Sequence, residues 1–375
     1  MIISRAVRNS GIGVRYARRM GTTSENPQTV IAQEVGNAGV ITLDRQKALN
    51  AINLDMVRQI YAAAKKFEQS KDLVIIKGAG EKAFCAGGDV RAVSYGPLEE
   101  AKAFFRQEYI LNASIQAFRK PYVALIDGIT MGGGVGLSVH GKYRVATERT
   151  LFAMPETAIG LFPDVGGGYF LPRLRGKLGM FLGLTGFRLK GRDVEKAGVA
   201  THYCESARIP ELEEALTKCS TDGDVAATLA KFCPKDTSEF ILNKHLAQID
   251  ECFSGATVEE ILERLRKDNS EWAQKTLQGL AKMSPTSMKV SKKQIDLGAN
   301  MTLPECLVME YRLAVRHAQD SDLKEGVRAL LVDRDNQPKW NPPTLEEVTD
   351  ERVDSFFKPL PDDLKFPTDI LQAKL

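Results

Sequence analysis

The chain contains 375 residues, of which 43% are hydrophobic, so its length is sufficient for one large domain with a sizeable core and an appended helical region. The formal net charge is only +3, and part of the basic excess lies at the N-terminus, so the charge does not favour a nucleic-acid partner. No apolar run approaches the length that spans a bilayer, and we expect no membrane insertion. The four histidines show no metal-ligand spacing, so we expect no metal site.

The first 25 residues differ in composition from the rest of the chain. No acid precedes Glu25, and aliphatic residues alternate with the arginines Arg5, Arg8, Arg15, Arg18 and Arg19. This pattern predicts a mitochondrial transit peptide over residues 1–25, removed between residues 20 and 26, and a location in the mitochondrial matrix. A disordered basic tail is one alternative. The C-terminal Ala373-Lys374-Leu375 is near the peroxisomal Ser-Lys-Leu signal, so the peroxisome is the alternative location.

From residue 30 to about residue 205, short β-branched runs alternate with helical periods. In chain order, we expect a hairpin of 30–35 and 40–43, a helix at 54–69, a strand at 73–77, a helix at 98–117, and strands at 122–126 and 143–146. From residue 210 onward helical periods dominate, at 211–219, 225–232, 258–268, 271–283 and 304–319. Strands first and helices later predict an α/β core over 26–205 and a helical C-terminal region over 206–375.

Two acids stand in an otherwise apolar stretch, residues 154–167, that glycine and proline interrupt. Burial disfavours the charged form of a carboxyl group, so Glu156 and Asp164 should have pKa values raised toward the range of proton exchange with substrate or water. Gly160 and Pro163 exclude a continuous helix between them, and a loop must therefore bring the two acids together. They are candidates for an acid/base pair. The structural alternative is that Glu156 caps a helix and Asp164 begins a glycine turn.

Two glycine-rich segments lie upstream of these acids, each after a strand-like run. The first contains Ala86-Gly87-Gly88, and the second contains Met131-Gly132-Gly133-Gly134. Glycine permits close backbone approach, and two converging amides stabilise the negative charge that a thioester carbonyl develops in an enolate or tetrahedral intermediate. Together the segments predict an oxyanion hole, although each alone is typical of a plain turn.

The run that begins at Gly136 is one residue short of a nucleophile elbow. That motif requires glycine at the position that His140 occupies. We therefore expect Ser138 and His140 to be packed or capping residues on the helix after the glycines.

In this order and spacing, the glycine segments and acids resemble the crotonase (enoyl-CoA hydratase/isomerase) superfamily over residues 30–199. The resemblance implies a spiral of β-β-α units, with a helical C-terminal region that closes the acyl pocket and helps to form homo-oligomers. It also implies that the amides of Gly88 and Gly133 are the two oxyanion-hole donors. Residues Lys47, Ala48 and Leu49 look like the loop that contacts the adenine side of coenzyme A.

Departures from the superfamily pattern indicate a branch. Enoyl-CoA hydratases carry one catalytic glutamate shortly after the triple glycine, where this chain has Gly136, and a second that corresponds to Glu156. Asp164 stands where hydratases usually have glycine, which is similar to the branch that hydrolyses 3-hydroxyacyl-CoA thioesters. Glu108 matches a substrate-contacting acid of that branch. The C-terminal segments that resemble it are 284–289, 324–333 and 338–340.

The resemblance therefore implies an acyl-CoA thioester hydrolase acting on 3-hydroxyisobutyryl-CoA in valine catabolism, with 3-hydroxypropionyl-CoA as a second candidate substrate. Coenzyme A is part of the substrate, and no cofactor is expected. Glu156 would attack the carbonyl or activate water, and Asp164 would deprotonate water or hold the substrate hydroxyl. Glu108 would position the hydroxyl end. The expected substrate contacts are Lys47, Ala48, Leu49, Glu108, Gly133, Glu156 and Asp164.

Two other functions stay open on the sequence. Hydration or double-bond isomerisation is disfavoured by Gly136, because one of the usual two acids is missing. A catalytically silent acyl-CoA-binding protein would use the glycine amides for binding alone. The retention of Glu156 and Asp164 argues against that reading.

Overall fold

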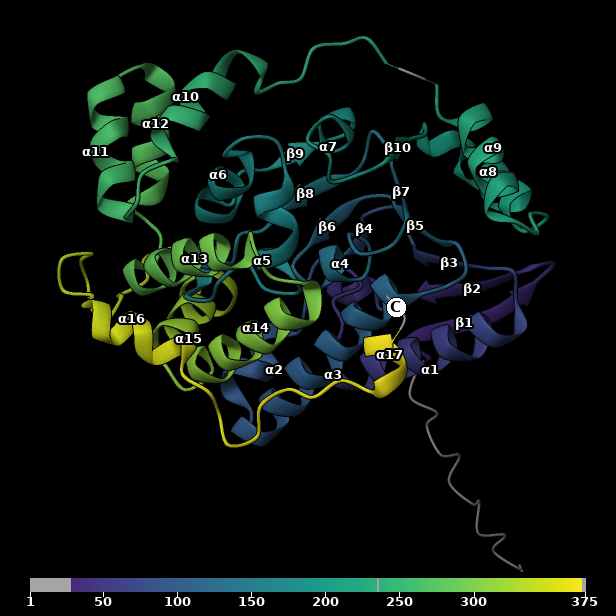
Figure 1. Cartoon of the computed structure of the whole chain (residues 1–375), viewed down its shortest axis with the longest axis horizontal. Coiled ribbons are helices and arrows are strands. Elements are labelled where there is room, and N and C mark those ends of the chain that lie inside the picture. The colour runs from purple at the N-terminus through teal and green to yellow at the C-terminus, as the bar shows by residue number, and fades with distance from the viewer. Residues whose placement is uncertain (1–27, 235, 373–375) are drawn as a thin grey trace, which may run out of the picture.

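The computed structural model describes residues 28–234 and 236–372. The expected transit peptide, residues 1–25, and the C-terminal Ala373-Lys374-Leu375 lie outside these described residues. Two β-sheets form the centre of the molecule, and helices cover them on several sides (Figure 1). Across the described part of the chain, no helix combines the length and hydrophobicity that a bilayer crossing requires.

The larger sheet has six strands in the order β1-β2-β3-β5-β7-β10. β1 (Val30–Val35) pairs antiparallel with β2 (Ala38–Leu43), which confirms the predicted hairpin. The other strands add in parallel and are β3 (Leu73–Gly78), β5 (Tyr122–Ile126), β7 (Tyr143–Ala146) and β10 (His202–Tyr203). Alternate residues of β3 enter two different hydrophobic clusters, so both faces of the sheet are covered and the first four residues of the strand are all apolar.

Three strands of the larger sheet are each followed at once by a short strand of a second sheet. These short strands are β4 (Ala83–Cys85), β6 (Ile129–Met131) and β8 (Leu151–Ala153), which pair in parallel, and β9 (Leu189–Lys190) joins β8 antiparallel. Each successive turn of the chain thus contributes one strand to each sheet. This arrangement confirms the predicted spiral of β-β-α units. Because β4 and β6 are neighbours, the two glycine segments that follow them emerge side by side.

The helices of the first half are α1 (Leu54–Ser70), α2 (Val90–Tyr95), α3 (Leu98–Ala117), α4 (Gly133–Gly136), α5 (Gly167–Phe170), α6 (Leu178–Thr185) and α7 (Arg192–Lys196). Asn53 directly precedes α1, and its side chain accepts a hydrogen bond from the Met56 N–H, as expected of an N-cap. α3 has the predicted bounds. It packs against α1 and α14, and its buried face carries Glu108 into the interior.

The C-terminal helices divide into three groups. α8 (Ile209–Leu216) and α9 (Asp222–Phe232) pack on the outer face of the larger sheet. α10 (Leu246–Cys252), α11 (Val258–Asp268) and α12 (Glu271–Leu280) gather at one end of the molecule (Figure 1). The remaining helices return to the core and are α13 (Pro285–Gly298), α14 (Leu303–His317), α15 (Ser321–Val327), α16 (Asp350–Phe357) and α17 (Thr368–Gln372).

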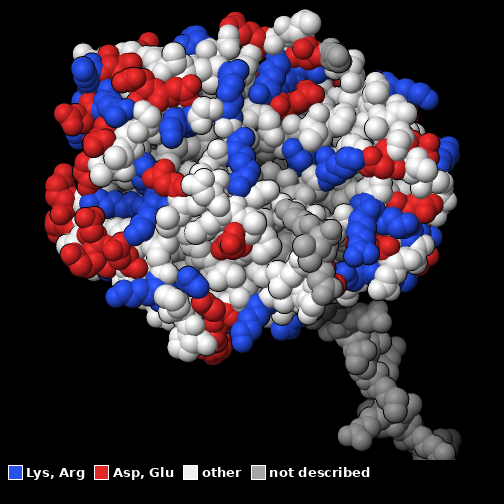
Figure 2. Space-filling model, in the orientation of Figure 1, with Lys and Arg blue, Asp and Glu red and all other residues white. Residues whose placement is uncertain are grey.

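Charged side chains of both signs are interspersed over the face shown in Figure 2, in keeping with the small net charge of the sequence. Acidic side chains gather at the left edge of that view, near the beginning of α16, whose first turn contains Asp350 and Glu351. This face therefore presents no continuous basic surface.

Helix α15 packs closely on the 3₁₀ turn η2 (Glu156–Ile159), which begins with the first candidate acid. A Cβ on Gly326 of α15 would lie 2.4 Å from the carbonyl carbon of Ile159. A Cβ on Gly160 would lie 2.3 Å from the backbone of Asp322. The N–H of Ser284 also donates to the Thr157 carbonyl at 3.1 Å. The C-terminal region thus fixes the backbone of the turn that carries Glu156.

This close packing predicts that Gly326→Ala destabilises the fold. The added methyl group overlaps backbone atoms that cannot rotate away, so we expect the free energy of unfolding to fall by about 1–3 kcal/mol. Urea denaturation would measure the change as a lower midpoint with an unchanged slope. Gly279→Ala on α12 is the matched control, because a Cβ there meets no atom within 4 Å. Equal effects of the two substitutions would contradict the packing argument.

Candidate active site

The glycine segments and the acids line one pocket of about 670 Å³. This volume is typical of small-molecule sites. The sequence predicted eight residues that act on or contact a substrate, and seven of them line this pocket, namely Lys47, Ala48, Gly88, Glu108, Gly133, Glu156 and Asp164. Leu49 does not line it. Instead, its carbonyl accepts a hydrogen bond from the Ala86 N–H at 3.0 Å, which ties this loop to the first glycine segment.

The two glycine segments approach each other at the base of the pocket. A Cβ on Gly133 would lie 3.3 Å from the backbone nitrogen of Gly88 and 2.6 Å from Oε1 of Glu108. A Cβ on Gly132, whose φ is 44°, would lie 3.1 Å from Oε1 of Glu156. Gly133 is the first residue of α4, so its N–H has no partner within that helix. Glycine at these positions therefore lets two backbone amides and two acids share a space that side chains would fill.

Three carboxyl groups are buried in this pocket. The exposed fractions of Glu108, Glu156 and Asp164 are 2%, 5% and 5%. Burial raises the pKa of Asp164 to about 7. Burial, and next the charge of Asp164, raise the pKa values of Glu108 and Glu156 well above the usual range. The pocket thus holds one acid, Asp164, whose protonation changes near neutral pH, as general acid/base chemistry requires, and two acids whose charged form burial disfavours.

Two of the carboxyl oxygens have no hydrogen-bond partner among the described residues, namely Oε1 of Glu108 and Oε2 of Glu156. A buried polar atom without a partner is costly, so these two atoms are suited to contact a ligand that enters the pocket. In the described part of the chain, no group of three or more His, Cys, Asp and Glu side chains has an arrangement that would hold a metal ion.

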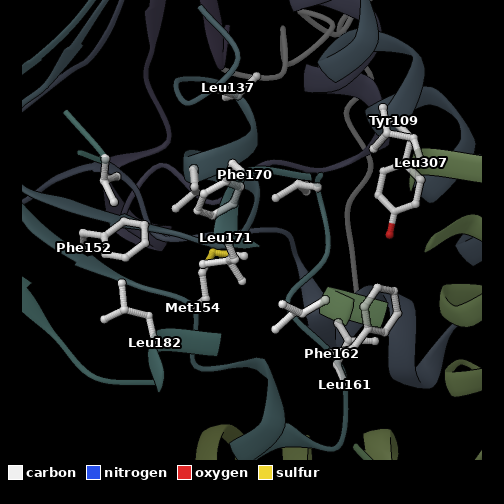
Figure 3. Packing of buried hydrophobic residues seen from close by; sticks show 14 of the residues in the cluster. Tyr109, Leu137, Phe152, Met154, Leu161, Phe162, Phe170, Leu171, Leu182 and Leu307 are labelled. Atoms are coloured by element: carbon white, nitrogen blue, oxygen red, sulfur yellow. The ribbon is translucent and has the colours of Figure 1, made fainter. Parts of the chain in front are cut away.

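Tyr109 is a site residue that the sequence did not indicate. Its hydroxyl donates to Oδ2 of Asp164 at 3.0 Å and lowers the pKa of that acid, against the larger effect of burial. Figure 3 shows this hydroxyl turned toward the segment that carries Leu161 and Phe162. A tyrosine on the buried face of an amphipathic helix is indistinguishable from a core residue in the sequence. Its position next to Glu108 was the only available signal.

Gly136 occupies a place with no room for an acid. A Cβ there would lie 2.7 Å from Cβ of Val165 and 2.8 Å from Nδ2 of Asn112. The loop that carries Asp164 therefore fills the space next to α4 where a second glutamate would stand. Asp164 enters the pocket from this loop instead.

The residues after Gly136 behave only in part as expected. Ser138 is packed, and its hydroxyl donates to the Gly134 carbonyl at 3.0 Å. α4 ends at Gly136, however, because the chain turns there, so neither Ser138 nor His140 lies on a long helix. Nε2 of His140 lies 2.7 Å from the carbonyl oxygen of Val165.

Cationic side chains surround the wider part of the pocket. They come from separate segments of the chain and are Arg45, Lys47, Arg91, Arg188 and Arg334. Arg45 forms an ion pair with Asp89 at 2.8 Å. Except for Lys47, these residues were not expected from the sequence, because single arginines on separate loops form no motif.

The fold and this site define the class of protein. A family profile described as enoyl-CoA hydratase/isomerase matches residues 38–357, and the chain belongs to this family. A carnitinyl-CoA dehydratase from Mycobacterium thermoresistibile has a similar structure, with a TM-score of 0.85, 38% identity, and 90% of this chain and 99% of that chain covered. An enoyl-CoA hydratase from Rhodobacter sphaeroides 2.4.1 gives a TM-score of 0.83 at 37% identity and covers 90% and 100%.

Curated relatives narrow the resemblance within the family. The chain is 55% identical over 359 residues to the mitochondrial 3-hydroxyisobutyryl-CoA hydrolase of Danio rerio, covering 92% of this chain and 93% of the relative. It is 54% identical over 361 residues to the protein of the same name from Homo sapiens, covering 93% of each. The resemblance to a hydrolase branch that the sequence motifs indicated is thus confirmed.

The raised pKa of Asp164 predicts that Asp164→Asn stabilises the protein in a pH-dependent way. The ordinary pKa of 3.8 applies to the unfolded chain, and the folded value is about 7. Between these values the folded state retains a proton that the unfolded state has released, so wild-type stability falls as pH rises through this window. Asparagine does not ionise. At pH 8 the variant should gain on the order of 4 kcal/mol.

Urea denaturation at pH 8 and pH 4 would measure this difference. The gain should disappear at pH 4, where both proteins carry a neutral side chain. A gain that is the same at both pH values would contradict the assignment.

Proposed function

We propose that this chain hydrolyses the thioester of 3-hydroxyisobutyryl-CoA to 3-hydroxyisobutyrate and free coenzyme A, as a step of valine catabolism. The observation that carries the proposal is the buried pair of Glu156 and Asp164 beside the amides of Gly88 and Gly133, with Gly136 where a hydratase has the glutamate that follows its triple glycine. The relatives at 54–55% identity with this name support it. 3-Hydroxypropionyl-CoA is a second candidate substrate.

The thioester carbonyl binds with its oxygen toward the amides of Gly88 and Gly133. Both N–H groups donate to the oxygen as it becomes negative, which stabilises the tetrahedral intermediate. In the preferred route, Glu156 attacks the carbonyl carbon, coenzyme A leaves as the thiolate, and water then hydrolyses the acyl-enzyme anhydride. In the alternative route, Glu156 removes a proton from water, and the hydroxide attacks the carbonyl directly.

Asp164 is suited to orient and deprotonate the water, because its pKa of about 7 allows it to accept and return a proton. Glu108 positions the hydroxyl end of the substrate. Its unpartnered Oε1 lies beside Gly133, where it would bond to a hydroxyl of a bound acyl group. An acyl group without that hydroxyl leaves the oxygen unpaired, so the site should reject it.

The coenzyme A part of the substrate lies in the wider part of the pocket. Its phosphates are anionic, and the cations there match them in charge. Lys47 and Ala48 contact the adenine side, and Leu49 supports their loop through its backbone. The amides and acids of the chain suffice for thioester hydrolysis, so the proposal requires no cofactor and no metal ion.

The remaining parts of the proposal concern organisation and location. Residues 1–25 are a transit peptide, 26–205 the catalytic core, and 206–375 the region that closes the acyl pocket, where Leu323, Leu330 and Leu331 line it. Relatives named as mitochondrial support a mitochondrial location, and we propose the matrix. The substrate is the small-molecule partner, and a homo-oligomer is the proposed assembly, with neither a nucleic acid nor a membrane as a partner.

Release of free coenzyme A, followed with a thiol reagent, tests this function. Protein without residues 1–25 should release coenzyme A from 3-hydroxyisobutyryl-CoA at least about 100-fold faster than from isobutyryl-CoA, because the hydroxyl contact is lost in the latter. Crotonyl-CoA should give neither thiol nor loss of its ultraviolet absorbance. Hydration of crotonyl-CoA without thiol release from any ester would contradict the proposal.

Glu156→Gln is the control variant for this assay. It keeps the size and one carbonyl oxygen of the side chain but neither attacks a thioester nor accepts a proton from water. We expect the variant to bind a coenzyme A ester and to release no coenzyme A. Full activity of this variant would remove Glu156 from the mechanism.

A further inference from the structure

The residue that follows Asp164 has an unfavourable backbone conformation. Val165 is fully buried and has a φ of +52°, in the left-handed region that a β-branched side chain rarely adopts. Such a conformation is unfavourable for valine and persists only where its surroundings determine it. The orientation of Asp164 depends on this conformation, because a different φ at Val165 would redirect the chain between Asp164 and α5.

Both ends of the peptide group between Val165 and Gly166 are held by buried side chains. Nε2 of His140 lies 2.7 Å from the Val165 carbonyl oxygen, where the ring N–H donates. The Gly166 N–H donates to Oε2 of Glu310 at 2.7 Å. His140 follows α4, and Glu310 lies in α14, so two distant parts of the sequence meet on one peptide group.

Further contacts of Glu310 extend this support along the loop. Its Oε1 accepts hydrogen bonds from the Gly168 N–H at 2.9 Å and from Nε2 of Gln294 at 3.0 Å. Nε2 of Gln294 also donates to the Pro163 carbonyl at 2.7 Å. The backbone on both sides of Asp164 is therefore bound to α13 and α14.

Stability alone does not explain this arrangement. Glu310 is 0% exposed, and burial raises its pKa to about 8, so the acid is costly compared with an apolar residue of similar size. Three groups donate hydrogen bonds to Glu310, and each either belongs to the loop or binds to it. What the arrangement secures is one conformation of residues 163–168, and Asp164 is the member of that loop that reaches the pocket.

We propose that His140 and Glu310 are positioning residues for Asp164, which clamp the Val165–Gly166 peptide and so hold the carboxyl group at the substrate. The inference rests on the proposed function of Asp164 in the hydrolysis. Neither residue lines the pocket. They affect the reaction only by fixing the conformation of the loop that carries Asp164.

Kinetics of free coenzyme A release from 3-hydroxyisobutyryl-CoA test the clamp. His140→Leu removes the group that donates to the Val165 carbonyl. Glu310→Gln replaces one carboxylate oxygen by an amide NH2 group, which cannot accept a hydrogen bond from a backbone N–H. Each should lower kcat by about 10-fold to 100-fold, because small displacements of a catalytic group have effects of this size, while KM changes less than about 3-fold. His140→Gln, which keeps a donor at the position of Nε2, should retain most of the activity. Glu305→Gln, an exposed position on the same helix, is the matched control.

Val165→Gly distinguishes a clamp from a general structural role. Glycine adopts a positive φ without steric cost, so it should restore part of the kcat that His140→Leu loses. A purely structural role of His140 would predict that the double variant is worse than the single one, because Val165→Gly also removes buried contacts. Equal activity of His140→Leu and His140→Gln would likewise overturn the proposal.

Hydrogen exchange provides a readout that does not depend on activity. In Glu310→Gln, the amides of Gly166 and Gly168 should exchange at least about 10-fold faster, while amides of β3 keep the wild-type rate. Unchanged exchange at both glycines would overturn the clamp. If the wild-type protein releases no coenzyme A, the proposed function fails, and the exchange rates still decide whether Glu310 holds the loop.

Discussion

The burial of three carboxyl groups in one pocket is the constraint on which the rest of the structure depends. Glu108, Glu156 and Asp164 are nearly excluded from solvent, and besides this burial the charge of Asp164 raises the cost of ionising the other two. Such a group of acids reduces stability, and it stays buried only where the surrounding backbone leaves no alternative arrangement. The fold supplies that backbone from three directions, namely α3, the turn η2 and the loop that leads to α5. Proton exchange near neutral pH is the chemical consequence.

The two halves of the chain fix different parts of the site. The spiral of paired strands sets the backbone amides, because β4 and β6 are neighbours and each ends directly before a glycine segment. The C-terminal helices set the acids. α15 packs on the turn of Glu156 through Gly326, and α13 and α14 bind the loop of Asp164 through Gln294 and Glu310. The chain thereby combines the fold of the family with a particular arrangement of acids. The loop of Asp164 leaves no space for an acidic side chain at Gly136.

Local patterns predicted much of the fold and part of the site. The hairpin, α3 and five later helices, namely α8, α9, α11, α12 and α14, follow from apolar periodicity, whereas α10, α13, α15 and α16 were not predicted. The two acids in an apolar stretch, taken together with the glycine segments, indicated Glu156 and Asp164. The second sheet was not predicted in detail, because strands of two or three residues have no measurable period. Tyr109 and Glu310 were missed for another reason. Their contacts join residues 55 and 144 positions apart, and no local pattern records such a pair.

The carboxyl titration of Asp164 tests the central claim most directly. Carbon NMR of protein with labelled aspartate side chains, compared with the Asp164→Asn variant, would isolate this one resonance. The account predicts a midpoint at about pH 7, because burial disfavours the charged form more strongly than the Tyr109 hydroxyl favours it. A midpoint near the ordinary value of 3.8 would mean that the carboxyl group is solvated and is not the buried acid on which the site depends.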